Sequence, residues 1–348
     1  MLAVLLLAAV IWIAGHFLKV DRRKRGVLLA LLFGMVLLTH VVLPDGHALR
    51  EATGGSLAAW ALLALAVALV LAYRYGLGHL KERADARAAP TAEETPAGTF
   101  SATELERYAR HIVLRELGGP GQKKLKQARV LVIGAGGLGA PALLYLGAAG
   151  VGTIGIVDDD TVENANLQRQ VIHRDGDIGM PKVFSAEQAI LAQNPHVTVR
   201  PYRRRLDEAV AADLFADYDL ILDGTDNFAT RYLANRTAVA QGKPLISGAL
   251  SQWEGQISVF DPANGAPCYQ CIFPEAPAPG LAPSCAEAGV LGPLPGVVGA
   301  MMAVEAVKLI AGAGAPLRGE MLIYDALWSE TRKIGLKRRA DCPVCGGH

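Results

Sequence analysis

A short apolar segment followed by a glycine-rich loop limits the fold of this chain more than any other feature. Residues 129–133 form an apolar run that predicts a β-strand, and residues 140–149 form a run of small residues that predicts a helix. Four glycines stand between them, at positions Gly134, Gly136, Gly137 and Gly139. Glycines let the backbone turn tightly and approach a phosphate, while the helix N-terminus offers free N–H groups and partial positive charge. This order predicts an α/β fold that binds a nucleotide.

A second apolar run, residues 153–157, predicts the next strand and leads into Asp158. Asp158 follows Gly139 by nineteen residues, a spacing at which an acidic side chain can accept hydrogen bonds from ribose hydroxyls. The default interpretation of this fingerprint is an NAD-dependent dehydrogenase. A glycine turn without any ligand is the structural alternative. The fingerprint alone therefore indicates a nucleotide without deciding the chemistry.

Three polar motifs farther along the chain are not required by a dehydrogenase. They are Asn164-Ala-Asn166-Leu-Gln-Arg169-Gln170, Gly179-Met-Pro181-Lys182 and Asp223-Gly-Thr-Asp226-Asn227. Lys182 stands at a predicted helix start, and the last motif follows a mostly apolar run over residues 218–222 that predicts a strand. The carboxyl ends of parallel strands meet at one edge of an open α/β sheet, where ligands bind. We therefore expect these polar side chains around one ligand.

Together these motifs resemble the adenylation domain of the MoeB, ThiF and HesA family, which are relatives of the ubiquitin-activating enzymes. The resemblance includes Arg107-Tyr-Ala-Arg110 near the start of the domain and extends over residues 100–348. Within the family it is most similar to the molybdopterin-synthase adenylyltransferases. It implies a doubly wound, Rossmann-like α/β domain with a mostly parallel sheet.

The resemblance also implies roles for the polar side chains. Asp158 would hold the ribose of ATP, and Arg169 and Lys182 its triphosphate. Asp226 would bind a Mg²⁺ ion, and Arg110 would reach the nucleotide of the partner in a homodimer. The other motif positions that would contact ATP are the four glycines together with Asp160, Asn166, Gln170 and Asn227. Outside this context Arg169 and Lys182 would be ordinary surface cations. Asp226 would then merely cap the helix that follows.

The implied reaction is activation of the C-terminal carboxylate of a small ubiquitin-like sulfur-carrier protein that ends in two glycines. Attack of this carboxylate on the α-phosphate of ATP gives a carrier acyl-adenylate and pyrophosphate. Cations at the site would stabilise the charge that builds on the transferring oxygens. Carriers of the molybdopterin, thiamine, thiolated-tRNA and amino-acid sulfuration pathways are all compatible with the motifs. A nicotinamide or flavin oxidoreductase and a membrane scaffold that binds carriers without activating them stay open as alternatives.

All five cysteines lie in the last quarter of the chain, and four of them form two C-x-x-C pairs. The pairs are Cys268 with Cys271 and Cys342 with Cys345. Tetrahedral zinc takes four thiolates, and a two-residue gap lets one tight turn supply two of them. The paired knuckles therefore predict a structural Cys₄ zinc site. Disulfides, which a reducing compartment disfavours, and a redox C-x-x-C are the alternatives.

Cys285 is the cysteine outside these pairs, in a segment rich in Pro and Gly that begins near Pro274. A lone loop cysteine is usually inert, because thiol reactivity depends on the thiolate fraction and on access. In the family that the motifs resemble, a cysteine at this position can take part in thioester or persulfide chemistry. Cys285 is therefore a candidate nucleophile.

Two other features are expected to be structural. His111 and His173 belong to no cluster with metal-ligand spacing, so we expect them on a helix face or in a loop. Residues 297–310 form an apolar run that contains methionines, and they predict a core or dimer-interface helix.

The first eighty residues hold most of the excess apolar content of a chain that is 51% hydrophobic. Residues 2–18, 27–43 and 57–73 are each mostly apolar, with about the shortest length that crosses a hydrocarbon layer of roughly 30 Å. A cleaved signal peptide is the alternative for the first run, but no basic residues precede it. Buried soluble helices are the alternative for the other two, which lack a polar face. The sequence predicts a three-helix membrane anchor over residues 1–80.

Basic residues in the loops predict the orientation of this anchor. Residues 22–25 are all basic, whereas residues 44–56 contain a single arginine, Arg50. The positive-inside rule therefore places the N-terminus outside and the catalytic domain in the cytoplasm, at the inner (cytoplasmic) membrane. Residues 81–99, rich in Ala, Pro, Thr and charge, are expected to form a flexible linker to a catalytic domain over residues 100–348. The net charge of +1 argues against a nucleic-acid partner.

Overall fold

The computed structural model describes residues 1–54, 56–88, 99–278 and 288–346. Contacts divide the chain into two units, Met1–Glu93 and Glu94–His348.

The N-terminal unit is helical. Its helices are α1 (Leu2–Phe17), α2 (Arg22–Val42), α3 (Ala48–Thr53) and α4 (Leu57–Ala88). Val4, Val36 and Trp60 are buried where these helices meet, while many other large apolar side chains of the unit are exposed. Helices α2 and α4 contain apolar windows of 19 and 21 residues, which are long enough to cross a membrane. Helix α1 has 16 residues, or about 24 Å at 1.5 Å per residue, and is shorter than a usual span.

The predicted flexible linker over residues 81–99 is helical in its first part. Helix α4 continues to Ala88, and residues 89–98 lie outside the described residues. The extension has a physical reason, because residues 81–88 consist of Lys, Glu, Arg, Ala and Asp, and all of these except Asp are strong helix formers. The absence of an apolar stripe was therefore a poor sign of irregular structure here.

The C-terminal unit is built on an eight-stranded sheet with the order β3-β2-β1-β4-β5-β6-β7-β8. The strands are β1 (Arg129–Ile133), β2 (Thr153–Val157), β3 (Thr198–Tyr202), β4 (Leu220–Asp223), β5 (Leu245–Leu250), β6 (Glu254–Phe260), β7 (Glu320–Asp325) and β8 (Glu330–Gly335). Strands β3, β2, β1, β4 and β5 are parallel, with the strand order reversing direction between β1 and β4. The predicted doubly wound Rossmann-like core is confirmed.

The sheet as a whole is mixed, with four parallel and three antiparallel pairings, so the expected mostly parallel sheet holds for the half that carries β3, β2, β1, β4 and β5. Strands β6, β7 and β8 continue it in antiparallel pairings. Two of these connections are hairpins, since only a few residues join β5 to β6 and β7 to β8, and short connections permit only antiparallel neighbours. Every residue of β8 is exposed, so the strand carries no apolar alternation that would mark it in the sequence.

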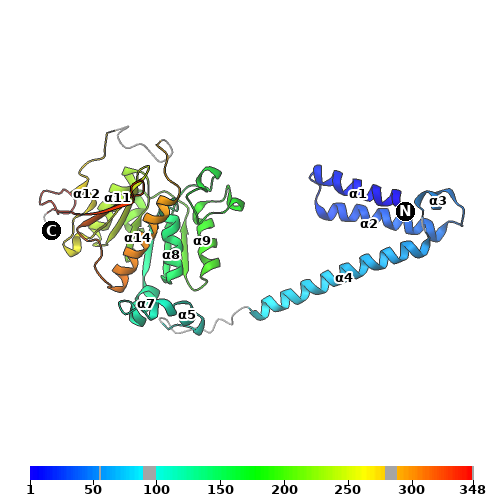
Figure 1. Ribbon diagram of the computed structural model, residues 1–348, viewed down its shortest axis with the longest axis horizontal. Helices are drawn as coiled ribbons and strands as arrows, with labels where there is room; N and C mark the ends of the chain where they lie inside the picture. The colour runs from blue at the N-terminus through cyan, green and yellow to red at the C-terminus, as the bar shows by residue number, and fades with distance from the viewer. Residues whose placement is uncertain (55, 89–98, 279–287, 347–348) are drawn as a thin grey trace. The chain divides into compact units, whose positions relative to one another are not determined.

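Helices cover both faces of the sheet. Leu131 and Ile133 of β1 point into one apolar core, while Val130 and Val132 point into the other, so the strand is buried on both sides. The core on the side of Val130 and Val132 is formed with α7 (Gly118–Gln127), α8 (Gly139–Ala149), α9 (Lys182–Gln193) and α14 (Pro293–Ala311). The core on the side of Leu131 and Ile133 is formed with α10 (Glu208–Ala216), α11 (Phe228–Ala240) and Tyr269 of α12 (Tyr269–Ile272). Figure 1 shows α8, α9 and α14 together over one face.

Helix α14 has the length and composition of a membrane span, with a mean hydropathy of 1.7. Its side chains nevertheless belong to the core of the C-terminal unit, because Val298, Met302 and Ala306 are buried against the sheet. The expectation of a core helix over residues 297–310 is confirmed. The remaining short elements are α5 (Ala102–Arg107), α6 (Ala109–Ile112), η1 (Asn164–Asn166), η2 (Asp175–Asp177) and η3 (Pro262–Asn264).

Candidate functional site

A cavity of about 1120 Å³ opens at the carboxyl ends of the parallel strands. This is the position at which the strand order reverses, and open α/β sheets bind ligands there. The residues predicted to bind nucleotide that line it are Gly134, Gly136, Gly137, Asp158, Asp160, Arg169, Gln170, Lys182, Asp226 and Asn227. Gly139, Asn166 and Arg110 do not line it, and Cys285 lies outside the described residues.

The glycine loop takes a form that only glycine permits at two positions. Gly134 has a φ of +91°, which side-chain-bearing residues rarely adopt. Gly139 begins α8, and a Cβ atom there would lie 1.8 Å from the carbonyl oxygen of Gly134. Gly139 therefore shapes the loop by allowing this close approach, although it is not among the residues that line the cavity.

Asp158, at the end of β2, fixes the loop on its other side. One carboxylate oxygen accepts the N–H of Ala135 at 2.8 Å, and the other accepts the N–H of Asp160 at 2.9 Å. Burial raises the pKa of Asp158, and the nearby Lys182 ammonium opposes that shift. Each carboxylate oxygen has a second lone pair, so Asp158 can still accept a hydrogen bond from a ribose hydroxyl.

Lys182 and Arg169 place two cations in the cavity. Lys182 is the first residue of α9, and its Nζ lies 2.7 Å from Oδ2 of Asp160. The Lys182 side chain is 5% exposed and that of Asp160 is 65% exposed, so a buried cation is paired with a solvated carboxylate. Arg169 donates to the carbonyl of Ala165 at 3.2 Å and to Oδ1 of Asn166 at 3.4 Å. Asn166 therefore orients Arg169 and is not itself a wall residue.

Asp226 and Asn227 have different roles in the loop after β4. Asn227 caps α11, because its Oδ1 accepts the N–H of Thr230 at 2.9 Å. Asp226 is exposed in the cavity, and its carboxylate has no partner among the residues that the structure describes. The alternative role of Asp226 as the helix cap therefore does not apply, since the neighbouring asparagine performs it.

Arg231 is a site residue that the sequence analysis missed. It is 6% exposed and donates to Oγ of Ser247 at 2.8 Å, to the carbonyl of Gly248 at 2.7 Å, and to the carbonyl of Thr225. It also pairs with the fully buried Asp223 at 3.4 Å. This network fixes the loop that carries Asp226. The only sequence signal was an arginine one turn into the helix after a polar loop, which does not reveal burial.

Gln170 is a buried amide in the wall of the cavity, with hydrogen-bonding capacity that the described residues do not use. Its side chain is 5% exposed, and Oε1 is buried without a hydrogen-bond partner among the described residues. A buried, unsatisfied acceptor is costly unless a ligand or water donates to it. Gln170 lines the cavity, so a turn of its amide would present this oxygen to a hydroxyl or amino group of a nucleotide.

Arg110 lies on α6, outside the cavity of its own chain. The segment that carries it is anchored by Tyr108, whose hydroxyl accepts from Nδ2 of Asn194 at 2.8 Å. Arg110 is exposed, and it has no partner among the residues that the structure describes. Its predicted role toward a partner's nucleotide stays a prediction.

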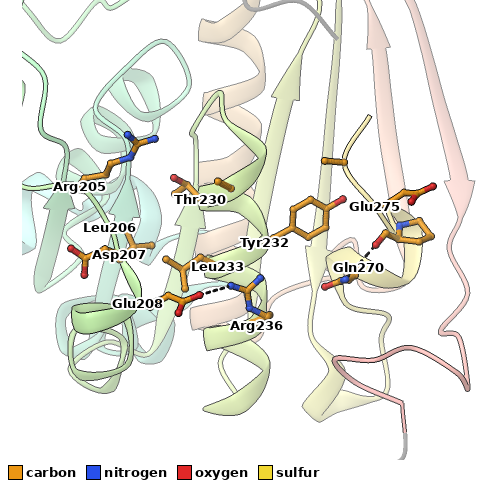
Figure 2. Close-up of a pocket in the computed structure, with 13 residues that line it drawn as sticks. Arg205, Leu206, Asp207, Glu208, Thr230, Tyr232, Leu233, Arg236, Gln270 and Glu275 are labelled. Carbon is orange, nitrogen blue, oxygen red and sulfur yellow. Dashed lines mark hydrogen bonds and ion pairs between the residues drawn. The ribbon is translucent and has the colours of Figure 1, made fainter. Parts of the chain in front are cut away.

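A second hollow, of about 670 Å³, adjoins the cavity between α10, α11 and α12 (Figure 2). Arg205 and Thr230 line both spaces. In the second hollow the charges of Arg236 and Glu208 are paired at 3.1 Å. The glycine loop and the predicted phosphate ligands line the first space, whereas an arginine and a glutamate that pair with each other line the second.

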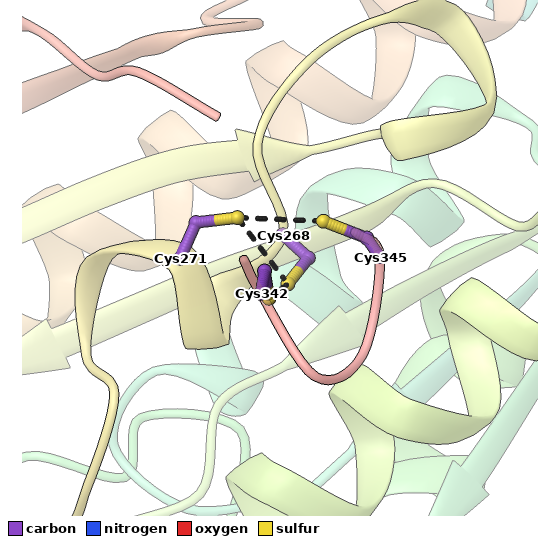
Figure 3. A group of neighbouring side chains, drawn as sticks. All are labelled: Cys268, Cys271, Cys342 and Cys345. Carbon is purple, nitrogen blue, oxygen red and sulfur yellow. Dashed lines mark hydrogen bonds between the residues drawn. The ribbon is translucent and has the colours of Figure 1, made fainter. Parts of the chain in front are cut away.

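The four paired cysteines come together in one buried cluster (Figure 3). The Sγ atoms lie 3.8 Å apart for Cys268 and Cys271, 3.6 Å for Cys268 and Cys342, and 3.4 Å for Cys271 and Cys345. A tetrahedron with Zn–S bonds of about 2.3 Å has edges of about 3.8 Å. The cluster therefore fits one tetrahedral zinc ion, and it joins the C-terminal segment to α12.

Comparison with known proteins identifies the family. The ThiF family model matches residues 108–344. The chain is 54% identical over 251 residues to a probable adenylyltransferase/sulfurtransferase MoeZ of Mycobacterium tuberculosis, covering 71% of this chain and 64% of that protein. It is 50% identical over 247 residues to the sulfur carrier protein adenylyltransferase of Thermus thermophilus, covering 70% of this chain and 91% of that protein.

A solved structure of E. coli MccB with AMPCPP and MccA has the same fold, with a TM-score of 0.62. The two chains are 22% identical, and the match covers 71% of this chain and 76% of that one. The family match, the relatives and the glycine-loop cavity agree with the motifs from which the resemblance was drawn. The chain belongs to the ThiF family.

Proposed function

We propose that this chain is an ATP-dependent adenylyltransferase that activates the C-terminal carboxylate of a small ubiquitin-like sulfur-carrier protein ending in two glycines. The convergence of the glycine loop, Asp158, Arg169, Lys182 and Asp226 on one cavity carries the proposal. The names of the MoeZ and Thermus thermophilus relatives support the same activity. The glycine loop and Asp158 would also suit an oxidoreductase, but neither that alternative nor a scaffold that does not activate its carrier requires Arg169, Lys182 and Asp226 in the same cavity.

In the proposed reaction, a carboxylate oxygen of the carrier attacks the α-phosphorus of ATP. The bond from this phosphorus to the bridging oxygen breaks, and pyrophosphate leaves. Two anions must approach each other, so the cations of Arg169 and Lys182 would lower the barrier by stabilising the developing negative charge. The exposed carboxylate of Asp160 pairs with Lys182 at 2.7 Å. When ATP binds, phosphate oxygens would replace this carboxylate as the partner of Lys182, so the buried cation would be paired in both states.

Two metals belong to the proposal. The unpartnered carboxylate of Asp226 would hold Mg²⁺, which would neutralise phosphate charge when bound. Zinc in the Cys268, Cys271, Cys342 and Cys345 cluster would be structural, since all four positions of the tetrahedron are filled by the protein.

The assembly is also part of the proposal. Arg110 is exposed and lies outside its own cavity, as a residue reaching a partner's nucleotide in a homodimer would be. Cys285 stays a candidate for covalent chemistry with the activated carrier.

The N-terminal unit is proposed to anchor the enzyme in the inner membrane, with its N-terminus outside and the catalytic unit in the cytoplasm. The apolar windows Lys24–Val42 and Leu57–Leu77 support two of the three spans. Helix α1, with 16 residues, would cross as a short third span, since an odd number of spans places the two ends on opposite sides. The exposed apolar side chains of this unit, such as Leu31 and Leu65, would face lipid. The basic cluster at residues 22–25 supports the orientation.

Mass spectrometry of the carrier tests the activity directly. Small diglycine-ended proteins are incubated with the full chain in detergent, ATP and Mg²⁺, and the carrier mass is measured before the mixed anhydride hydrolyses. We expect one AMP adduct per carrier molecule and none on a carrier that lacks its final glycine. An absence of adduct and of pyrophosphate with every carrier tested would contradict the proposal.

A further inference from the structure

Ala135, inside the glycine loop, is held at both of its backbone groups. Its N–H donates to Asp158 at 2.8 Å, and its carbonyl oxygen lies 2.9 Å from Nε2 of His173. His173 is 6% exposed, so its ring forms this contact away from solvent. A carbonyl oxygen can only accept, and Nε2 of His173 therefore carries the hydrogen.

The other ring nitrogen connects His173 to helix α9. Nδ1 lies 2.8 Å from Oγ of Ser185, and that hydroxyl lies 2.7 Å from Oδ2 of Asp177. Ser185 follows Lys182 by three residues on α9. A single chain of hydrogen bonds thus joins Asp177, α9 and the glycine loop. The proposed mechanism gives no role to the side chains of His173, Ser185 and Asp177.

We propose that His173 is a positioning residue for ATP, holding the Ala135 carbonyl so that the N–H of Gly136 faces the phosphates. This inference rests on the proposed ATP-binding function. The peptide bond between Ala135 and Gly136 is planar and trans, so its C=O and N–H point in opposite directions. Fixing the carbonyl toward His173 therefore turns the N–H of Gly136 away from the histidine.

The N–H of Gly136 is free to bind an anion. Gly136 lines the cavity, and its N–H donates to no acceptor among residues 99–278 and 288–346. Backbone N–H groups in a glycine loop before a helix N-terminus are effective donors to phosphate oxygens. Without His173, the peptide could rotate, and this donor would lose its fixed direction.

The bond to Ala135 does not depend on the charge of the ring. The charged groups around His173 are Asp177, Asp158 and Lys182, and burial is the main cause that lowers the pKa of His173. A neutral ring keeps its hydrogen on Nε2, and the single hydrogen of the Ser185 hydroxyl, which points to Asp177 in the structure, then turns to Nδ1. A protonated ring donates from both nitrogens, and Ser185 then donates to Asp177. The Ala135 carbonyl receives a hydrogen bond in either state.

Matched substitutions of His173 test the inference through ATP affinity, measured by calorimetry on the full chain in detergent without a carrier. His173→Leu removes the donor at similar volume, whereas His173→Gln places an amide N–H where Nε2 stood. We expect the leucine variant to bind Mg²⁺–ATP about three- to tenfold more weakly, the range that one lost hydrogen bond gives. The glutamine variant should bind within about twofold of the wild type, as should Ser185→Ala, which keeps the Nε2 donor.

The outcomes separate this inference from the proposed function. If the wild type binds ATP and the leucine variant binds equally well, His173 does not position the loop. Equal weakening in the leucine and glutamine variants would show that His173 acts only through packing and would also overturn the inference. If the leucine variant does not fold, His173→Met, another side chain without a donor, gives the same comparison. A wild type that binds no ATP refutes the proposed function, and the inference fails with it.

Discussion

Replacing Arg231 tests how the loop that carries Asp226 is held. Arg231→Met keeps most of the apolar stem but removes the guanidinium, which leaves the fully buried Asp223 without its cation. Loss of one partner from a buried ion pair costs about 3–5 kcal/mol. Three hydrogen bonds to Asp223 remain, from the N–H and hydroxyl of Thr225 and from Ser247, so we expect the lower end of that range. For a unit of this size, about 3 kcal/mol lowers Tm by roughly 6–12 °C.

Thermal unfolding of the full chain in detergent, followed by tryptophan fluorescence, measures this effect. Arg236→Met is the matched control, because Arg236 lies on the same helix and its ion pair with Glu208 is largely exposed. An exposed pair contributes about 0–1 kcal/mol, so this control should shift Tm by less than about 4 °C. Adding Asp223→Asn to Arg231→Met should recover part of the loss by removing the unpaired charge. Equal Tm values for Arg231→Met and Arg236→Met would refute the reasoning.

Three further predictions concern the metal, the thiol and the membrane. Purified protein should contain about one zinc per chain, and Cys342→Ser should lower both zinc content and Tm; full zinc occupancy after serine replaces all four clustered cysteines would contradict this. Cys285→Ala should leave carrier-dependent ATP–pyrophosphate exchange unchanged but abolish any thiol-sensitive conjugate with the carrier, and a conjugate that survives the substitution would exclude Cys285. A reporter fused after His348 should be cytoplasmic and one inserted near Gly54 external; the opposite pattern would reverse the proposed orientation.

The nucleotide half of the molecule could be predicted because its signals are local. The glycine loop, Asp158 and Lys182 each stand beside a strand or helix whose apolar pattern is clear, and the structure brings them to one cavity. The cysteine pairs could be predicted for a related reason, since each C-x-x-C fixes two ligands within a single turn.

Tertiary contacts account for what the sequence did not reveal. His173 meets Ala135 across 38 positions of the chain, and Arg231 meets Gly248 across 17. Nothing in the neighbouring residues marks either side chain as buried. The antiparallel strand β8 was also missed, because its fully exposed residues have no periodic pattern. Asn166 was placed in the site by its motif, but its contact with Arg169 shows an indirect part.

Carrier-dependent ATP–pyrophosphate exchange is the measurement that tests the proposed adenylyltransferase most directly. Asp226→Ala removes the exposed cavity carboxylate proposed to hold Mg²⁺, so exchange should fall by about 10²-fold or more, as for loss of one strong electrostatic stabiliser. Asp213→Ala removes an exposed carboxylate of α10 that does not line the cavity, and exchange should stay at the wild-type level. If Asp226→Ala exchanges as fast as Asp213→Ala with every competent carrier, the assigned site is wrong.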